Sequence, residues 1–454
     1  MKLSTRSQAN TGSNLTNHTR QLAKLALPLT AGMLAPLLIG IADVLLVGHV
    51  SDAALPAVAF GITLYMFAVT SSQAIAITHQ VVVLRPLGDD NRLLASYLLW
   101  RSLGIVLITS LTWVALILAF ASPLAELMLS SPASKAEAVA WISVRAWGLP
   151  AVSVAMVLSV HLQASLKPIY SVVNSITSNT LNVVASAFLI YGFGMLPALG
   201  VQGSAYGSIL AEAFSVTFMV ITYAFLRPIS SPGSCWRNVI RIDLPRDYRP
   251  ILVSEFGNVI SLNTSEVAFV AILAVVGDAA LGAGQVAITV MDVLTALAIA
   301  GATAFQILEG RDGGPGTSLF SWRPHVLILV IFILLGALLG TFTQTVASWF
   351  TDGSLASLTA SGLVLVAVSS PLIWLSAQSA AYLRAWRRSR TVLVATTLAA
   401  WAVQVPLAFL LGIVLDLGLT GALIAYVGYH LVRVLIQGLA ISRLVRVTAE
   451  AGNP

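Results

Sequence analysis

The sequence predicts an all-α polytopic membrane protein, with 12 transmembrane helices in two pseudo-symmetric six-helix bundles around a central cleft. The composition, the number of long apolar stretches and an internal repeat support this fold class. Of the 454 residues, 57% are hydrophobic and 9% are charged, and the mean hydropathy is +0.90. Soluble proteins carry about 25% charged residues. Most of this chain is therefore expected to face lipid or other helices.

Apolar stretches long enough to cross the hydrocarbon core, which takes about 20 helical residues, recur along the whole chain. The first six lie at roughly 25–48, 56–80, 94–121, 137–161, 169–193 and 199–226. The second six lie at roughly 249–276, 283–307, 325–350, 356–383, 391–415 and 419–442.

Lysine and arginine are unevenly distributed between alternate connections. If the N-terminus is cytoplasmic, the inward-facing segments hold 20 of the 24 basic residues, and the outward-facing loops hold only Lys135. The positive-inside rule then predicts that both termini are cytoplasmic. The same bias accounts for the net charge of +6 without an anionic partner such as nucleic acid. The Arg-rich, Ala-rich composition favours a multi-pass protein of the cell inner membrane.

The two halves of the chain repeat one another. Asp52-Ala-Ala-Leu55 recurs as Asp278-Ala-Ala-Leu281, 226 residues later, and Leu199-Gly-Val-Gln-Gly203 resembles Leu417-Gly-Leu-Thr-Gly421. Pro150 likewise resembles Pro371. An even number of spans per half gives parallel repeats, an arrangement found in alternating-access transporters. We expect a cytoplasmic tail (1–24), a six-helix bundle (25–226), a basic linker (227–248), a second bundle (249–443) and a cytoplasmic C-terminal tail (444–454).

The first span carries a single charge, Asp43, and has Pro28 near its start, where the helix can bend. A carboxylate in an apolar span costs about 2.5–3.5 kcal/mol on insertion scales, so Asp43 needs water, a partner or a proton. Asn179 and Asn182 lie in the fifth span, Glu212 in the sixth, and Arg145 enters the fourth.

Several of these motifs together resemble one family. They are Leu27-Pro28 with Ile41-Ala-Asp43 and Val47-Gly48-His49, Val144-Arg145 with Pro150, Asn179-Thr-Leu-Asn182, and Gly200-Val-Gln-Gly203-Ser-Ala205. In order and spacing they resemble the multidrug and toxic compound extrusion (MATE) family, and within it the DinF-like branch. The resemblance implies a secondary active multidrug exporter, an H+-coupled antiporter of organic, often cationic and amphipathic compounds. It also implies that Asp43 takes the coupling proton and that the bend near Pro28 responds.

The first half departs from the family pattern at Ser186, where the family often has an aspartate. Asn182 is expected either to hydrogen-bond Asp43 or to join helices. Glu212 resembles a glutamate common in the DinF-like branch, and either takes part in transport or pairs with a basic residue. Arg145 is expected to pair with a buried acid or to reach the headgroups.

The second half contributes Glu255, Glu266 and Asp292. Glu266 is a candidate for binding a cation or substrate. Asp292 resembles an aspartate of DinF-like members and is either functional or structurally paired. Glu255 lies near the cytoplasmic end of its span and either reaches the headgroups or has a functional role. Na+ coupling through Glu266 or Asp292 is the alternative to H+ coupling through Asp43.

Other classes of function lack their signatures. His79, His161 and His430 are scattered, are expected near membrane interfaces and show no metal-binding spacing, so we expect neither a metal nor a cofactor. The sequence shows no phosphate-binding loop and no nucleophile elbow, which argues against an ATP-driven pump and an intramembrane enzyme. A flippase of lipid-linked precursors with the same fold remains a rival. We expect a monomer whose partners are small organic substrates and the lipid bilayer.

Overall fold

The computed structural model describes residues 20–34, 54–129, 131–193, 197–226, 245–312, 322–351 and 353–451. The chain folds into two compact units. The N-terminal unit is Ala31–Leu252, and the C-terminal unit combines Met1–Thr30 with Val253–Pro454. The first helical segment, 20–34, therefore crosses from one unit to the other.

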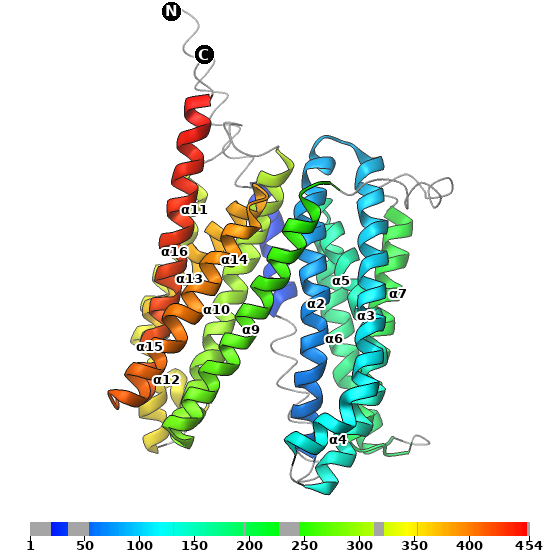
Figure 1. The fold of residues 1–454 in the computed structure, drawn as a ribbon, viewed down its shortest axis with the longest axis vertical. Helices are drawn as coiled ribbons and strands as arrows, with labels where there is room; N and C mark the ends of the chain where they lie inside the picture. Colours follow the sequence, from blue (N-terminus) through cyan, green and yellow to red (C-terminus); the bar gives the residue numbers. More distant parts are fainter. Residues whose placement is uncertain are drawn as a thin grey trace, which may run out of the picture. The chain divides into compact units, whose positions relative to one another are not determined.

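The N-terminal unit consists of packed helices of membrane-spanning length (Figure 1). Its helices are α2 (Ala54–Gly88), α3 (Arg92–Met128), α4 (Pro132–Arg145), α5 (Leu149–Ala164), α6 (Pro168–Tyr191) and α7 (Val201–Leu226). A single 3-10 turn, Ala146–Gly148, joins α4 to α5, so that the two form one continuous span.

The C-terminal unit takes up most of α9 (Tyr248–Val276) and continues with α10 (Asp278–Arg311), α11 (Trp322–Thr341), α12 (Thr343–Ser348) and α13 (Gly353–Ala385). The next span is α14 (Ser389–Thr397), a π-helical segment (Leu398–Gln404), α15 (Val405–Phe409) and a second π-helical segment (Leu410–Val414). The last helix is α16 (Gly418–Ala451).

The predicted spans agree with these helices. Each of the second to twelfth spans overlaps a helix or a continuous helical run, and in the described ranges nine of these are long and apolar enough to cross a membrane. The helix 20–34 covers the start of the first span, and the rest of that span lies outside the described residues. Helix α6 is absent from the nine because a polar series from Asn174 to Asn182 lowers its hydropathy.

Helix pairing within one unit resembles pairing within the other. In the N-terminal unit α5 packs on α2, α3 and α7, and in the C-terminal unit α13 packs on α10, α11 and α16. These pairs occupy equivalent places in the sequence repeat. The largest buried core of the C-terminal unit is built around Trp374 and Phe269.

The repeated Leu-Gly-x-x-Gly motif has the same geometry in both units. Gly200 and Gly418 each have φ +56°, a left-handed conformation that favours glycine. A Cβ on Gly203 would lie 2.5 Å from the backbone of Leu189 and Ile190, and one on Gly421 would lie 2.6 Å from the carbonyl oxygen of Leu411. The motif thus turns the chain and lets the next helix pack directly on the backbone of the previous one.

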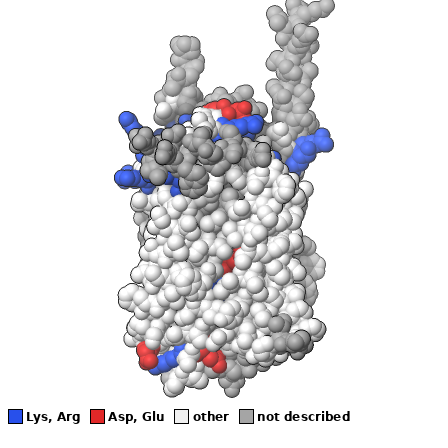
Figure 2. Space-filling model, turned by 90° about the vertical axis from the view of Figure 1, so that its right-hand side faces the viewer, with Lys and Arg blue, Asp and Glu red and all other residues white. Residues whose placement is uncertain are grey.

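Charged side chains are concentrated at the two ends of the helices. In the space-filling view they gather at the top and bottom of the visible face, and the band between them is almost entirely uncharged (Figure 2). This distribution is the one expected of helices that cross a bilayer, where a charge in the hydrocarbon region is costly.

The helix packing at Gly203 generates a first prediction. Gly203→Ala forces the α6 and α7 backbones apart, and overpacking of this kind costs about 1–3 kcal/mol. We expect a lower melting temperature for the purified protein in detergent. Gly104→Ala is the matched control, because a Cβ there meets nothing within 4 Å. Equal melting temperatures for the two variants would contradict the close approach.

Candidate functional site

The first-span residues are only partly described. Pro28 is half-buried in the helix 20–34. Asp43 lies outside the described residues, and so does any hydrogen bond between Asp43 and Asn182. The role of Asp43 as the proton-accepting carboxylate therefore stays a prediction.

The fifth-span amides make local hydrogen bonds along α6. The side-chain amide of Asn179 donates to the backbone carbonyl of Ser175 at 2.7 Å. Ser186 Oγ donates to Asn182 Oδ1 at 3.3 Å, and Ser186 is 1% exposed. Ser186 packs where α7 approaches most closely, since a Cβ on Gly207 would lie 2.4 Å from Ser186 Oγ. At Ser186 a small side chain, in place of a carboxylate, allows this contact.

Arg145 and Glu212 form an ion pair inside the N-terminal unit. Arg145 donates from Nη1 and Nη2 to the two carboxylate oxygens of Glu212, at 2.7 and 2.6 Å. Their side chains are 11% and 12% exposed. Tyr65 donates its hydroxyl to Glu212 Oε1 at 2.6 Å, and the Arg145 guanidinium lies 3.8 Å from the centre of the Tyr65 ring. The structure thus selects the paired alternative for both Arg145 and Glu212.

This ion pair needs a glycine beside it. A Cβ on Gly148 would lie 1.8 Å from Glu212 Oε2 and 2.6 Å from Arg145 Nη1. The Arg145-Ala-Trp-Gly148 sequence therefore supplies both the guanidinium and the space that the carboxylate occupies, at the 3-10 turn between α4 and α5.

Glu255 is also paired rather than free. Arg384 of α13 donates from Nε and Nη2 to its two oxygens, both at 2.9 Å. The Glu255 side chain is 1% exposed, so the expectation that it reaches the headgroups is wrong. A guanidinium from a neighbouring helix neutralises it within the C-terminal unit instead. The spacing of 129 residues between the partners is why the sequence did not reveal this pair.

Glu266 and Asp292 form the unpaired carboxylate cluster of the C-terminal unit. Both are exposed on the surface of this unit, although each lies in the interior of an apolar helix. Glu266 precedes the end of α9 by 10 residues and Asp292 follows the start of α10 by 14, which puts them about 15 and 21 Å from those helix ends. Their charges are close enough to interact. In the described ranges neither carboxylate has an ion pair.

Aromatic and polar side chains of α16 complete this cluster. Tyr426 lies within electrostatic reach of Glu266 and Asp292 and hydrogen-bonds the side chain of Gln404. Arg433 Nη1 donates to the Tyr429 hydroxyl at 3.1 Å. Sequence reasoning did not select these residues. Their spacing at 426, 429 and 433 places them on one face of a helix and is the signal that would have found them.

The three histidines singled out in the sequence turn inward, away from water and headgroups. His79 and His161 are both 0% exposed and hydrogen-bond each other inside the N-terminal unit, and His430 is 5% exposed and lies 3.1 Å from Ser376 Oγ. The rotation of each helix about its own axis turns these rings inward. The positions of the histidines in the sequence did not reveal this rotation. In the described ranges no three His, Cys, Asp or Glu side chains gather in a way that would hold a metal ion.

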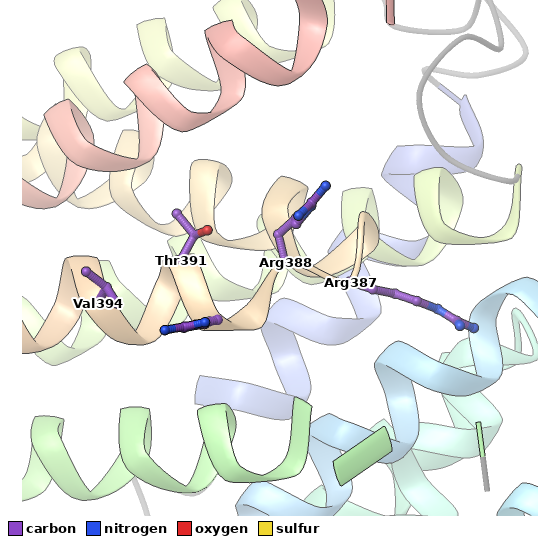
Figure 3. A pocket seen from close by; sticks show the side chains of 5 residues that line it. Arg387, Arg388, Thr391 and Val394 are labelled. Atoms are coloured by element: carbon purple, nitrogen blue, oxygen red, sulfur yellow. The ribbon is translucent and has the colours of Figure 1, made fainter. Parts of the chain in front are cut away.

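The arginine-rich loop after α13 borders a pocket of about 340 Å³ lined by Arg387, Arg388, Arg390, Thr391 and Val394. The side chains of Arg387 and Arg388 point in different directions and do not converge on one point (Figure 3). This arrangement does not form a single convergent anion site.

Comparison with known proteins identifies similar sequences and similar structures. Residues 28–188 match the family model described as MatE. The chain is 21% identical to "Probable multidrug resistance protein NorM" of Thermotoga maritima over 90% of this chain and 89% of the relative. It is 27% identical to the protein of the same name from Burkholderia mallei, over 69% of this chain and 66% of the relative. A crystal structure of a mutant of the Vibrio cholerae MATE transporter VcmN superposes with a TM-score of 0.86, covering 96% of this chain and 98% of that chain at 16% identity.

The fold is that of polytopic MATE transporters, which confirms the expected fold class. The family model and the full-length relatives add sequence agreement to the shared fold. Residues 28–188 thus carry the MatE family pattern, and the chain as a whole has the fold of MATE transporters.

The Arg145–Glu212 pair generates a second prediction. Glu212→Leu or Arg145→Met alone leaves an uncompensated charge in the unit, a loss of about 3 kcal/mol or more. The double variant removes both charges, so we expect it to recover part of the melting temperature that either single variant loses in detergent. Additive losses in the double variant would show that the two side chains act independently.

Proposed function

We propose that this protein is a secondary active multidrug exporter that moves organic, often cationic and amphipathic compounds out of the cell by alternating access. Protons entering down their gradient would drive this export. The proposal rests on the transporter family, on relatives that are named probable multidrug resistance proteins, and on the intramembrane carboxylates. As a transporter it would need no cofactor and no covalent catalysis.

The observation that carries the proposal is the contrast between paired and unpaired carboxylates. Glu212 and Glu255 each receive two hydrogen bonds from an arginine, so each belongs to a bidentate ion pair. Glu266 and Asp292 have no such partner in the described ranges and lie at the unit surface inside apolar helices. Unpaired intramembrane acids are typical of ion and substrate pathways. With Asp43 they are our candidates for exchanging a proton or attracting a cationic compound.

Na+ coupling is the second candidate, and the oxygen atoms around Asp292 favour it. Two carboxylates, the Tyr426 hydroxyl and the Gln404 side chain offer the oxygen ligands that hard cations prefer. In that case the coupling site would lie in the C-terminal unit rather than at Asp43. A flippase of lipid-linked precursors is less favoured, because Arg145 and Arg384 are engaged by glutamates and are unavailable to a phosphate.

Placement in the DinF-like branch rests on the Arg145–Pro150 motif, Glu212 and Asp292. We further propose a monomer in the cell inner membrane with both termini in the cytoplasm. The substrates are small organic compounds, and neither a metal nor nucleic acid takes part.

Efflux of ethidium from proteoliposomes tests the coupling ion. We expect an imposed pH gradient to drive efflux, a sodium gradient to have no effect, and Asp43→Asn to abolish the pH-driven efflux because it removes the titratable group. Glu266→Gln and Asp292→Asn locate the second-half site. Glu126→Gln is the control, since this exposed carboxylate pairs only with Lys135 at the surface.

The other outcomes separate the alternatives. Efflux driven by sodium alone, with Asp43→Asn active and Asp292→Asn inactive, would replace proton coupling by sodium coupling. Efflux driven by neither gradient would contradict the drug-exporter proposal and direct attention to lipid-linked precursors.

The single cysteine tests the proposed orientation. Cys235 lies in the basic linker, so in intact cells a membrane-impermeant maleimide should label it only after permeabilisation. Lys135→Cys in a Cys235→Ser background is the matched control and should be labelled without permeabilisation. The reverse pattern would place the termini outside.

A further inference from the structure

We propose that His79 and His161 form a proton-binding site inside the N-terminal unit, distinct from the intramembrane carboxylates, and that the proton binds at Nε2 of His161. The site is a relay of three side chains, Ser102, His79 and His161, contributed by α3, α2 and α5. The inference extends the proposed proton-coupled function, but proton binding itself is measurable without transport.

The geometry is that of a continuous hydrogen-bonded chain. His79 Nδ1 lies 3.1 Å from Ser102 Oγ, and His79 Nε2 lies 3.0 Å from His161 Nδ1. The two rings are 5.3 Å apart between centroids. Ser102 and both histidines are 0% exposed. In the described part of the chain, His161 Nε2 is buried and has no hydrogen-bond partner.

The surrounding backbone determines which nitrogen carries each proton. The His79 ring also hydrogen-bonds the backbone of Leu98, one turn before Ser102 on α3. Within a helix the group open to a side chain is the carbonyl oxygen, which only accepts, so we infer that His79 carries its hydrogen on Nδ1. His79 Nε2 must then accept from Nδ1–H of His161. This assignment leaves His161 Nε2 as a bare lone pair, the atom of the relay that is able to bind a proton.

Packing alone does not require this polar pair. At the offsets of the sequence repeat, 226 and 221 residues, His79 corresponds to Phe305 and His161 to Tyr382. Phe305 and Tyr382 also contact each other in the C-terminal unit, with ring centroids 6.0 Å apart. The fold thus accommodates two aromatic rings at this place. The N-terminal unit instead has two imidazoles, whose ring nitrogens can donate or accept a proton.

Proton uptake changes the charge of the pair from zero to +1. The proton from water forms an N–H bond at His161 Nε2, and His161 still donates from Nδ1 to His79, so no other bond has to break. Four other titratable or charged groups lie near the relay. Tyr223 of α7 lies beside His161, and Tyr170 of α6 packs on the α5 core. Tyr248 at the start of α9 lies beside Ser102, and the charge of Arg101 of α3 acts on Tyr248. In the described ranges no carboxylate contacts either ring.

A protonated pair is poorly accommodated in the packing observed here. The new Nε2–H is a buried donor without an acceptor among the described residues, and the added charge is removed from water. Protonation therefore favours an arrangement in which His161 reaches water. His161 is in the last turn of α5, and His79 precedes the end of α2 by nine residues, about 14 Å. By the predicted topology this is the cytoplasmic end of the unit, where proton release is expected.

Nitrogen-15 NMR of the full chain, labelled at its six histidines in nanodiscs, tests the site directly. At neutral pH we expect His161 to show a protonated Nδ1 and a bare Nε2, and on acidification Nε2 to gain the proton. His79→Phe with His161→Tyr, which copies the Phe305–Tyr382 pair and preserves packing, identifies the signals by removing them. His430→Gln is the control and leaves them unchanged. An Nε2–H on His161 at neutral pH, or a bare Nε2 throughout the pH range of transport, would overturn the proposal.

Transport measurements test whether the site takes part in coupling. We expect the pH profile of ethidium efflux to shift in His161→Gln and in the Phe–Tyr variant, but not in His430→Gln. An unchanged profile in both variants would refute a role in coupling. If efflux proves sodium-driven, the proposed function fails, while the NMR result still decides whether the pair binds a proton.

Discussion

A guanidinium buried inside an apolar helix bundle is stabilised by a carboxylate within hydrogen-bond distance, because lipid does not solvate the charge. Two such pairs lie in the described ranges, Arg145–Glu212 in the N-terminal unit and Glu255–Arg384 in the C-terminal unit. Each joins helices that are distant in sequence. Gly148 leaves room for the first pair, and Tyr65 supplies it with a third hydrogen bond. The positions of α4, α7, α9 and α13 depend on these contacts.

This constraint also distinguishes the carboxylates that have an arginine partner from those that lack one. A carboxylate that receives two hydrogen bonds from an arginine already has a partner for its charge inside the apolar bundle. Glu266 and Asp292 are free of such a partner in the described ranges and share their surroundings with Tyr426. Under the proposed function, the acids that lack a guanidinium are therefore the candidates for exchanging a proton.

The two halves of the repeat share their backbone architecture but differ in the side chains at equivalent positions. Gly200 and Gly418 have the same left-handed conformation, and Gly203 and Gly421 allow the same close approach of the next helix. At other equivalent positions the units differ. The N-terminal unit places His79 and His161 where the C-terminal unit has Phe305 and Tyr382, while the carboxylate cluster of Glu266 and Asp292 lies in the C-terminal unit. Shared backbone requirements thus preserve the fold, and side chains at equivalent places differentiate the units.

The sequence by itself determined the all-α membrane class, the spans, the duplication and the family resemblance, because hydropathy and short glycine motifs are local properties of the chain. It also identified Arg145, Glu212, Glu266 and Asp292, since a charge in an apolar span is visible without a structure. Only the tertiary structure decided their partners. Glu255 meets Arg384 across 129 residues, and His79 meets His161 across 82, through helix rotation and packing that no local pattern encodes. For the same reason the sequence did not reveal that the histidines are buried, and it left Tyr65, Tyr426 and Ser102 unnoticed.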